Sequence, residues 1–437
     1  MRFETFVKDV RKALETVDGD LFVENGTVDA PKSGLHVSGS TKCRGDCRFI
    51  GDVFTSELEA HRGEVLVEGN LTADRLVKTR GSLEVKGDLK ADRVEVHKHA
   101  DIGGCLNAHE VDVGNSLTVD GVAKAHRVDV GGSLRCGSDA EFDRIDIGGS
   151  AEVRGAIRGE RIDVGGRFVC LGRVVSDYVD IGGSFEAGEV EVGKLDVGGT
   201  VAIGGGNVGR KVDVGGTFRS TGPLRFSVID VGGVASLAGG VGEDIEVGGK
   251  LDSEGSLTFN KLEVGGVVNI KGDAIGRSVS VGGLFHATGR VKLEEELSVG
   301  GAVEVGGSIE AEVVKIGGAV RAESVVALRS IETHKIRTVK GAKADRIEID
   351  RRGEALGPLV GREVVLQRGA CAEDVWGDRV VLLSGARARN VYAGVLEAEE
   401  GSDVTGSILF TGELLAERGC HFTAQPAKAE KLPDRPI

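Results

Sequence analysis

A short phrase recurs along residues 111–318 at almost constant spacing, and this periodicity constrains the fold more than any other feature. In most copies an aliphatic, an acidic and a second aliphatic residue precede two glycines, as in Val128-Asp-Val-Gly-Gly. The first glycine of the copies lies at positions 114, 131, 148, 165, 182, 198, 215, 232, 248, 265, 282, 300 and 317. No step departs by more than one position from a spacing of about 17 residues, and a period held this closely indicates a repeat architecture.

The repeat length indicates three short strands. Helix-pair repeats need roughly 30 residues or more, and leucine-rich repeats about 20–29. Residues 133–147 alternate apolar and polar side chains in short runs broken by Gly or Asp, which is a strand signal. Three strands of about four residues with tight corners form one triangular coil of a β-solenoid. The Gly-Gly pair is expected at a corner, because Gly takes positive φ without steric cost.

The register of the coils follows from the spacing. Strand side chains alternate between the two faces, so both aliphatic residues of the phrase point inward and the acidic residue points outward. We expect Val128, Ile145, Ile162 and Val179 to stack in an inner ladder, and Phe168 to stack on Phe185. Aromatic residues make up only 4% of the chain, so Val, Ile, Leu and Ala must fill a narrow core.

An acidic column is predicted on the outer surface. It contains Asp112, Asp129, Asp146, Asp163, Asp180, Asp196, Asp213, Asp230, Glu246 and Glu263. The residue two positions earlier is often basic, as at Arg127, Arg144, Arg161, Lys194, Lys211 and Lys261. Adjacent columns of opposite charge predict a solvated, mutually neutralised face. A divalent-cation ladder is the alternative, although the Gly-Gly-x-Gly-x-Asp nonapeptide of calcium β-rolls is missing.

Histidines and cysteines are the candidate ligands and redox groups. A second polar column contains Asp74, Asp92, His109, His126, Asp143, Glu160 and Asp177. We interpret it as a surface ladder, with a metal site as the alternative. The seven cysteines are Cys43, Cys47, Cys105, Cys136, Cys170, Cys371 and Cys420. Cys136 and Cys170 would lie two coils apart, roughly 9–10 Å, which is too far for a disulfide. Cys43 and Cys47 could span a corner, with a redox role as the alternative to simple burial.

The N-terminal segment differs from the repeats. Its apolar residues fall at three- and four-residue spacing, at Phe3, Phe6, Val7, Val10, Ala13, Leu14 and Val17. This pattern predicts an amphipathic helix over residues 3–17 that ends near Gly19. Because a solenoid must cover its open end, we expect residues 1–30 to form a helical cap. A partner-binding or membrane-surface helix is the alternative.

Four regions are predicted. Residues 1–30 form the cap, residues 31–320 the Gly-Gly solenoid, and residues 321–421 a continuing solenoid with one glycine per corner. Residues 422–437 are polar and proline-bearing, and we expect a disordered tail or a short partner motif. Coils from Leu35 to Cys420 would number about 22 and form a rod about 105 Å long. Trp376 and Tyr392, one repeat apart, would stack.

Composition narrows the possible functions. A formal net charge of −14 over 437 residues argues against a general nucleic-acid binder and gives no reason to favour anionic membranes. The sequence contains no apolar run of the length, about 18 residues, that a membrane-spanning helix needs. Met1–Val10 also lacks the apolar region of a secretory signal. We therefore expect a cytoplasmic protein, with peripheral membrane contact possible but not favoured.

A family resemblance follows from the repeats. Residues 81–96, Gly-Ser-Leu-Glu-Val-Lys-Gly-Asp-Leu-Lys-Ala-Asp-Arg-Val-Glu-Val, resemble the bactofilins, which are polymer-forming cytoskeletal proteins. The resemblance covers most of the chain, although a bactofilin core is far shorter, and longer archaeal relatives are the better comparison. It implies an all-β fold, a three-sided right-handed parallel β-helix, that assembles without nucleotide into filaments or sheets.

Three function classes follow from these observations. The first is a structural scaffold that self-associates, and the second an adaptor that recruits proteins through its charged faces, N-terminal helix or C-terminal tail. The third is an enzyme, which we do not expect. The regular period leaves no room for the long loops that carry active sites on β-helices, and no P-loop, Gly-x-Ser-x-Gly or His-Glu-x-x-His motif occurs. No catalytic residue, metal or cofactor is assigned.

Overall fold

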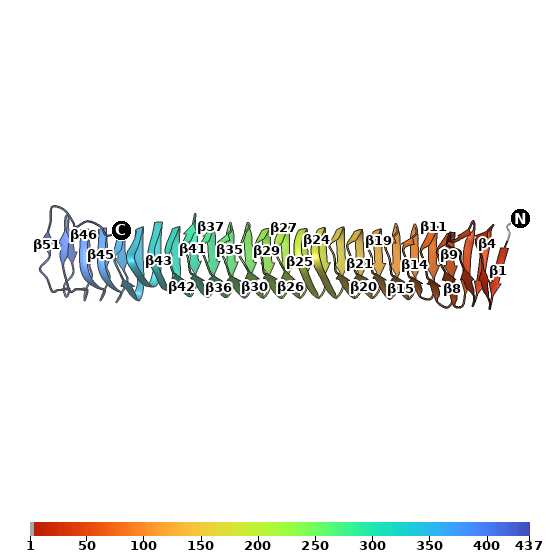
Figure 1. The fold of residues 1–437 in the computed structure, drawn as a ribbon. Coiled ribbons are helices and arrows are strands. Elements are labelled where there is room, and N and C mark those ends of the chain that lie inside the picture. The colour runs from red at the N-terminus through yellow and green to blue at the C-terminus, as the bar shows by residue number, and fades with distance from the viewer. Residues whose placement is uncertain (1–3) are drawn as a thin grey trace. The chain divides into compact units, whose positions relative to one another are not determined.

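The computed structural model describes residues 4–437, which form strands joined by short turns, and none of them is helical. The chain divides into two compact units, Met1–Thr221 and Gly222–Ile437. Each unit is a parallel β-solenoid, in which every strand pairs with the equivalent strand one coil later (Figure 1). The predicted solenoid is confirmed, with about 25 turns in all, because the coils begin at Glu4 and not at Leu35.

The N-terminal capping helix predicted for residues 3–17 is wrong. This segment contains three strands, β1 (Glu4–Lys8), β2 (Arg11–Ala13) and β3 (Thr16–Val17), while Phe3 lies outside the described residues. They pair in parallel with β4 (Asp20–Glu24), β5 (Thr27–Asp29) and β6 (Leu35–Val37). Phe6 pairs with Phe22 and Val7 with Val23, so contact with the next coil overrides the local helical spacing.

A regular coil has three sides, which we name by their place in the repeat. Side A carries the aliphatic-acidic-aliphatic phrase, as in β17 (Glu110–Val113). Side B follows the glycine corner, as in β18 (Ser116–Val119), and side C is the third, which begins β19 (Ala123–Val130). The end of β19 returns to side A, where it pairs with β17. One coil thus corresponds to one sequence repeat. Equivalent positions of successive repeats therefore lie on the same side of the solenoid.

The predicted inner ladders are confirmed in the first unit. Val128 pairs with Ile145, Ile145 with Ile162, and Ile162 with Val179, through β19, β21 (Ala140–Ile147), β23 (Ile157–Val164) and β24 (Arg167–Ile181). All four side chains are buried. The rings of Phe168 and Phe185 stack with centroids 5.4 Å apart, the latter in β25 (Ser184–Val197). The core is therefore a set of like side chains stacked coil on coil.

Glycine occupies the corners as predicted, but the expected reason, a positive φ, does not apply at the Gly-Gly corners. Gly131, Gly148 and Gly165 do not have positive φ. A Cβ on Gly165 would lie 2.4 Å from the carbonyl oxygen of Gly148, so the corner requires glycine because the backbones approach closely. In the single-glycine corners of the second unit the expectation holds, since Gly369 and Gly385 have φ of 69° and 72°.

The second unit continues without a break in strand pairing through the predicted join near residue 320. The long strand β43 (Ser308–Leu356) pairs with β41 (Glu296–Val299) and β42 (Ala302–Val305) before it. It also pairs with β44 (Leu359–Leu366) and β45 (Cys371–Leu382) after it. The last strands are β46 (Arg387–Ala398), β47 (Asp403–Val404), β48 (Ile408–Phe410), β49 (Leu414–Ala416), β50 (His421–Phe422) and β51 (Ala427–Lys428).

Candidate functional site

The charged columns of side A lie where the sequence places them. Asp112 pairs in register with Asp129, and Asp129 with Asp146, which confirms the acidic column. Several acids form ion pairs with the basic residue two positions earlier. Arg161 Nε is 2.7 Å from Asp163 Oδ2, and Lys194 Nζ is 3.0 Å from Asp196 Oδ2. These pairs confirm the predicted adjacency of cationic and anionic columns.

Repulsion within the acidic column remains where the basic neighbour does not compensate it. Partial burial raises the pKa of Asp129, and the charges of Asp146 and Asp112 raise it further, while Arg127 lowers it less. Residues 4–437 contain no group of three or more His, Cys, Asp or Glu side chains arranged to hold a metal ion.

The histidine column is a stack of rings at the corner between sides C and A. The rings of His109 and His126 are nearly parallel, with centroids 4.9 Å apart. His126 Nδ1 contacts Asp143 Oδ2 in the next coil, and the backbone N–H of His126 donates to the His109 carbonyl. The predicted stacking is confirmed. Its exposed position and flat geometry favour a surface ladder.

The cysteines lie as separate thiols. Cys43, Cys47, Cys136 and Cys170 are buried, and Cys105 is exposed. Burial raises the pKa of Cys136 to about 12 and that of Cys170 to about 11. Cys43 and Cys47 contact each other across a corner; this hydrogen bond and burial raise the pKa of Cys43, and the same hydrogen bond lowers the pKa of Cys47. Thiols held protonated, as at Cys43, Cys136 and Cys170, are poor nucleophiles and behave as core filler.

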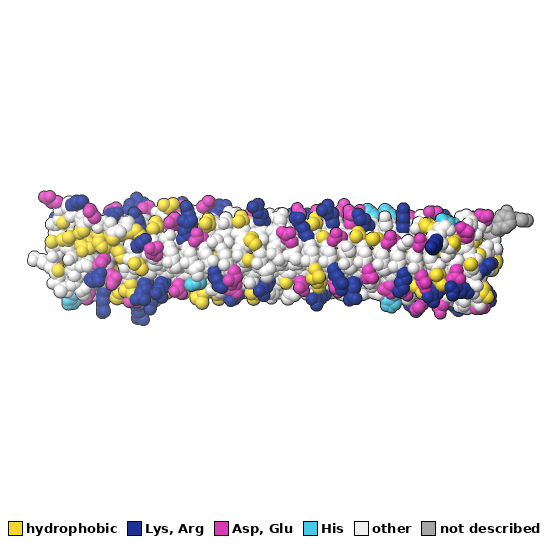
Figure 2. Space-filling view, viewed as in Figure 1, with side chains coloured by type: hydrophobic (Ala, Val, Ile, Leu, Met, Phe, Trp, Pro, Cys, Tyr) yellow, Lys and Arg dark blue, Asp and Glu magenta, His cyan; other side chains and the backbone are white. Residues whose placement is uncertain are grey.

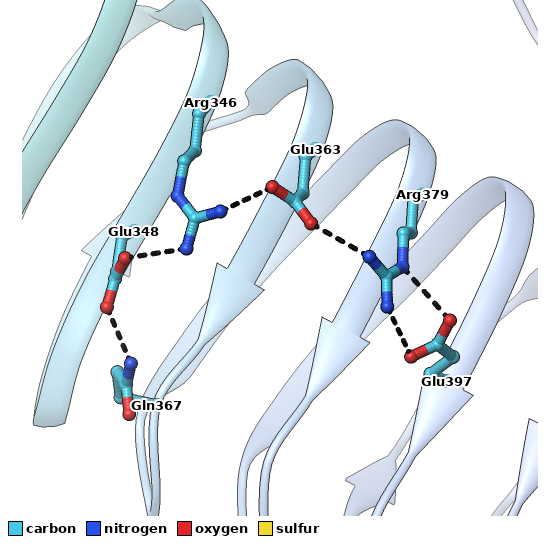
Figure 3. A network of polar contacts seen from close by, with 6 residues as sticks. All are labelled: Arg346, Glu348, Glu363, Gln367, Arg379 and Glu397. Atoms are coloured by element: carbon cyan, nitrogen blue, oxygen red, sulfur yellow. Dashed lines mark hydrogen bonds and ion pairs between the residues drawn. The ribbon is translucent and has the colours of Figure 1, made fainter.

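An ion-pair network in the second unit was not predicted from the sequence. Figure 3 shows Arg346 between Glu348 and Glu363, and Arg379 between Glu363 and Glu397. Glu348 also accepts a hydrogen bond from Gln367 Nε2 at 2.6 Å. Four coils are thus joined on side A. The signal that could have revealed the network is the alternation of Arg346, Glu363 and Arg379 at one register position, each one repeat after the last.

An open groove of about 770 Å³ lies on side C of the second unit. Outward-facing Thr258, Ile275 and Val326 line it, with Leu328 at one edge, where its side chain is 72% exposed. Its lining also carries two basic side chains, Arg277 and Lys292, and two acidic ones, Glu294 and Glu310. Histidine, cysteine and serine do not occur among its lining residues.

The first coil has an open backbone edge. Strands β1, β2 and β3 pair only with the following coil among the described residues. Phe6 stacks on Phe22 with ring centroids 4.9 Å apart, yet its side chain is 63% exposed. Lys12 pairs with the buried Val28 and so occupies an inward-facing position in this coil.

An apolar column runs along the outside of side C in the last coils. Val360 pairs with Trp376, and Trp376 with Tyr392, through β44, β45 and β46. The ring centroids of Trp376 and Tyr392 are 4.8 Å apart with the ring planes tilted by 32°, so the two rings are neighbours as predicted but are not stacked face to face. Leu409 of β48 extends the column. Outward-facing apolar residues thus occupy one register position in four successive coils.

The visible surface is otherwise mixed in charge. In Figure 2 the visible face of each unit carries both basic and acidic side chains, with uncharged atoms between them. Hydrophobic side chains gather over the coils of β45, β46 and β51. Among residues 4–437 there is no helix long and apolar enough to span a membrane.

The chain matches no family model, no curated protein and no solved structure.

Proposed function

We propose that this chain is a non-enzymatic structural scaffold, a solenoid that self-associates without nucleotide, as its resemblance to the bactofilins implies. The observation that carries the proposal is the open strand edge of the first coil. An unpaired parallel edge is a template for another strand, and natural proteins cover or block such edges unless they use them.

The backbone geometry of β1 supports strand addition. The N–H of Asp9 donates to the Glu24 carbonyl in the next coil. Because peptide groups alternate along a strand, the N–H groups of Phe6 and Lys8 point to the open side. The exposed Phe6 ring would gain a second stacking partner there.

The side chains of the first coil also limit which strand edges can pair with it. Lys12 occupies a position that is apolar in the following coil, where Val28 is buried. An inward-facing charge at an edge opposes indiscriminate pairing. A matching coil must therefore offer a carboxylate or open space at this position. The last coil carries Lys428 opposite the inward-facing Phe410, so its edge is restricted in the same way.

The cytoplasm is the proposed location. All seven cysteines are free thiols, which suits a reducing compartment.

Electron microscopy and light scattering test the scaffold. We expect concentration-dependent assemblies of the full chain, which Phe6→Pro abolishes because proline removes an N–H that points to the open edge. Phe6→Thr, which keeps that N–H, should retain part of the assembly. Deleting residues 1–18 is a poor test, because it would expose the equivalent edge of β4–β6. A full chain that stays monomeric across protein and salt concentrations would refute the proposal.

A second candidate is an adaptor that binds a protein segment in the side C groove. The groove combines exposed Leu328, apolar Ile275 and Val326, and charges of both signs. Its test is the set of co-purifying proteins. Ile275→Glu combined with Leu328→Glu should remove a specific partner, whereas Leu171→Glu in the first unit should retain it. Identical partner sets for the native chain and both variants would exclude the groove.

A further inference from the structure

Two members of the apolar column of side C, Val360 and Trp376, face outward but are buried, and this combination requires a cover. The register is unambiguous: Val375 and Gly377 point inward, so Trp376 between them points out. Nevertheless Val360 is 1% exposed and Trp376 is 9% exposed. Lys343, the preceding member of the same outward column, is exposed. Something therefore lies over Val360 and Trp376 that does not lie over Lys343.

The C-terminal segment, residues 429–437, is that cover. After β51 the chain turns back, and its C-terminus lies near β45 (Figure 1). Arg435 Nη2 is 2.7 Å from Asp378 Oδ1, two residues beyond Trp376. A Cβ on Gly341 would lie 3.4 Å from Ile437 Cγ2 and 3.1 Å from a Pro358 ring carbon. The segment thus returns over the coils whose outer faces are apolar.

The length of the segment fits this path. Gly377, Ala393, Phe410 and Lys428 pair in sequence, so Asp378 lies three coils before Lys428. Three coils span about 14 Å, because neighbouring strands are about 4.8 Å apart. The stretch from Lys428 to Arg435 spans up to about 24 Å when extended. The chain therefore reaches Asp378 without strain, and the remaining residues bring Ile437 beside Pro358.

No strand follows β51 in the described chain, although the N–H of Ala429 still donates to the Phe410 carbonyl at 2.8 Å. Beyond Ala429, the contacts that hold the segment to the coils are made by side chains. The Arg435–Asp378 pair lies at the surface, where ion pairs are weak. The Trp376 Nε1 donor is buried and has no partner among the described residues. Leaving this buried donor unmatched offsets part of the free energy that the cover gains by burying the apolar column.

We propose that the outer side C face, defined by Val360, Trp376, Tyr392 and Asp378, is a docking surface for the C-terminal segment, and that it also accepts the segment of a second copy. In the structure the surface binds its own segment. Exchange between copies preserves every contact, since the segment and the surface are identical in both. The inference deepens the proposed scaffold function and rests on it, because it names a surface through which copies associate.

Trp376 reports the contact directly, because it is the only tryptophan in the chain. Truncation after Lys428 should shift its emission to longer wavelength and increase its quenching by acrylamide several-fold. Asp378→Arg and Arg435→Asp should each produce part of this change. The double variant, which reverses the pair, should restore the native spectrum. An unchanged spectrum after truncation would overturn the docking surface.

Exchange is tested by complementation between two defective chains. The Asp378→Arg chain keeps a segment but lacks its anchor, and the truncated chain keeps the surface but lacks a segment. For this arm the segment donor also carries Trp376→Phe, so that all emission comes from the truncated acceptor. Mixing should restore the native spectrum of the acceptor and produce a one-to-one complex in light scattering.

A donor with Arg435→Asp added is the control and should fail to bind the acceptor. If the donor with its native segment also fails, exchange is overturned. The result is separable from that of the scaffold test. Chains that complement each other but form no assemblies in electron microscopy would retain the docking surface and refute the edge-mediated scaffold. Assemblies in electron microscopy without complementation between the chains would support the edge-mediated scaffold and refute exchange at the docking surface.

Discussion

Gly148 stacks on Gly131 of the preceding coil so closely that a Cβ on Gly148 would lie 2.3 Å from the Gly131 carbonyl oxygen. The same contact recurs at Gly165 and Gly182, at 2.4 and 2.3 Å. No side chain fits there without moving the backbone of a neighbouring coil. The glycines of the repeat are thus needed for the stacking of coils, which the solenoid propagates along its length.

Gly148→Ala should destabilise the first unit by about 1–3 kcal/mol, the usual cost of forcing extra volume into a packed site. Urea denaturation followed by circular dichroism measures the change. Gly209→Ala is the matched control, because its Cβ would meet only the Val192 carbonyl oxygen, at 3.9 Å. Equal losses for the two variants would contradict the steric explanation.

Phe168→Ala should cost about 3–5 kcal/mol, because it opens a cavity in a core one side chain wide. Phe168 is fully buried and stacks on Phe185. Leu171→Ala, in the same strand but 62% exposed, should change stability by less than about 0.5 kcal/mol. Thermal and chemical denaturation of both variants measure the difference, and a mild effect of Phe168→Ala would show that the coil collapses around the cavity.

Asp129→Asn should stabilise the protein at neutral pH. The pKa of Asp129 is raised in the fold by burial and by Asp146 and Asp112, so folding disfavours its charged form. The stability that protonated Asp129 contributes to the fold is fully present below the pKa of the unfolded chain. It is lost as the pH rises through the pKa of the folded state. The gain from Asp129→Asn should therefore be seen at neutral pH and vanish in acid, below the unfolded pKa, in denaturant titrations.

Asp196→Asn, in contrast, should destabilise the protein at neutral pH, because Asp196 forms an ion pair with Lys194 at 3.0 Å. The loss should be small, since the pair is partly exposed, and should shrink in high salt. If both substitutions change stability in the same direction at neutral pH, the basic neighbours do not determine which acids of the column are stabilising.

Native thiol labelling should separate the cysteines by burial. Iodoacetamide in mildly alkaline buffer should modify Cys105 within minutes, while Cys136 and Cys170, with pKa values of about 12 and about 11, should react only after unfolding. Mass spectrometry of peptides from native and denatured protein gives the sites. Rapid native labelling of Cys136 would reveal local opening of its coil.

The N-terminal segment shows where local sequence patterns fail. Phe6, Val7 and Val10 have helical spacing, and the first two also recur one coil later as Phe22 and Val23. The three- and four-residue spacing predicts a helix, whereas the recurrence one coil later predicts a solenoid coil. Pairing with β4 provides strand hydrogen bonds and a stacked ring that an isolated helix lacks, and so the longer period prevails.

The C-terminal coils show a related limit. The contact between the Trp376 and Tyr392 rings follows from their spacing of one repeat, but spacing does not reveal that both rings face outward beneath a returning segment. Arg435 and Asp378 are 57 residues apart and belong to no shared repeat. The Arg346–Glu363–Arg379 network, by contrast, follows the period and could be predicted in the same way as the acidic column.

The period of the sequence is enough to predict the solenoid, its three strands per coil, the inner ladders and the charged columns. Each of these recurs once per coil, and a periodic contact is visible in a periodic sequence. The strands of the first coil, the close glycine stacking and the segment that covers Trp376 became apparent only in the folded chain. They depend on which backbone lies next to which, and at the ends of a repeat that neighbour is not specified by the period.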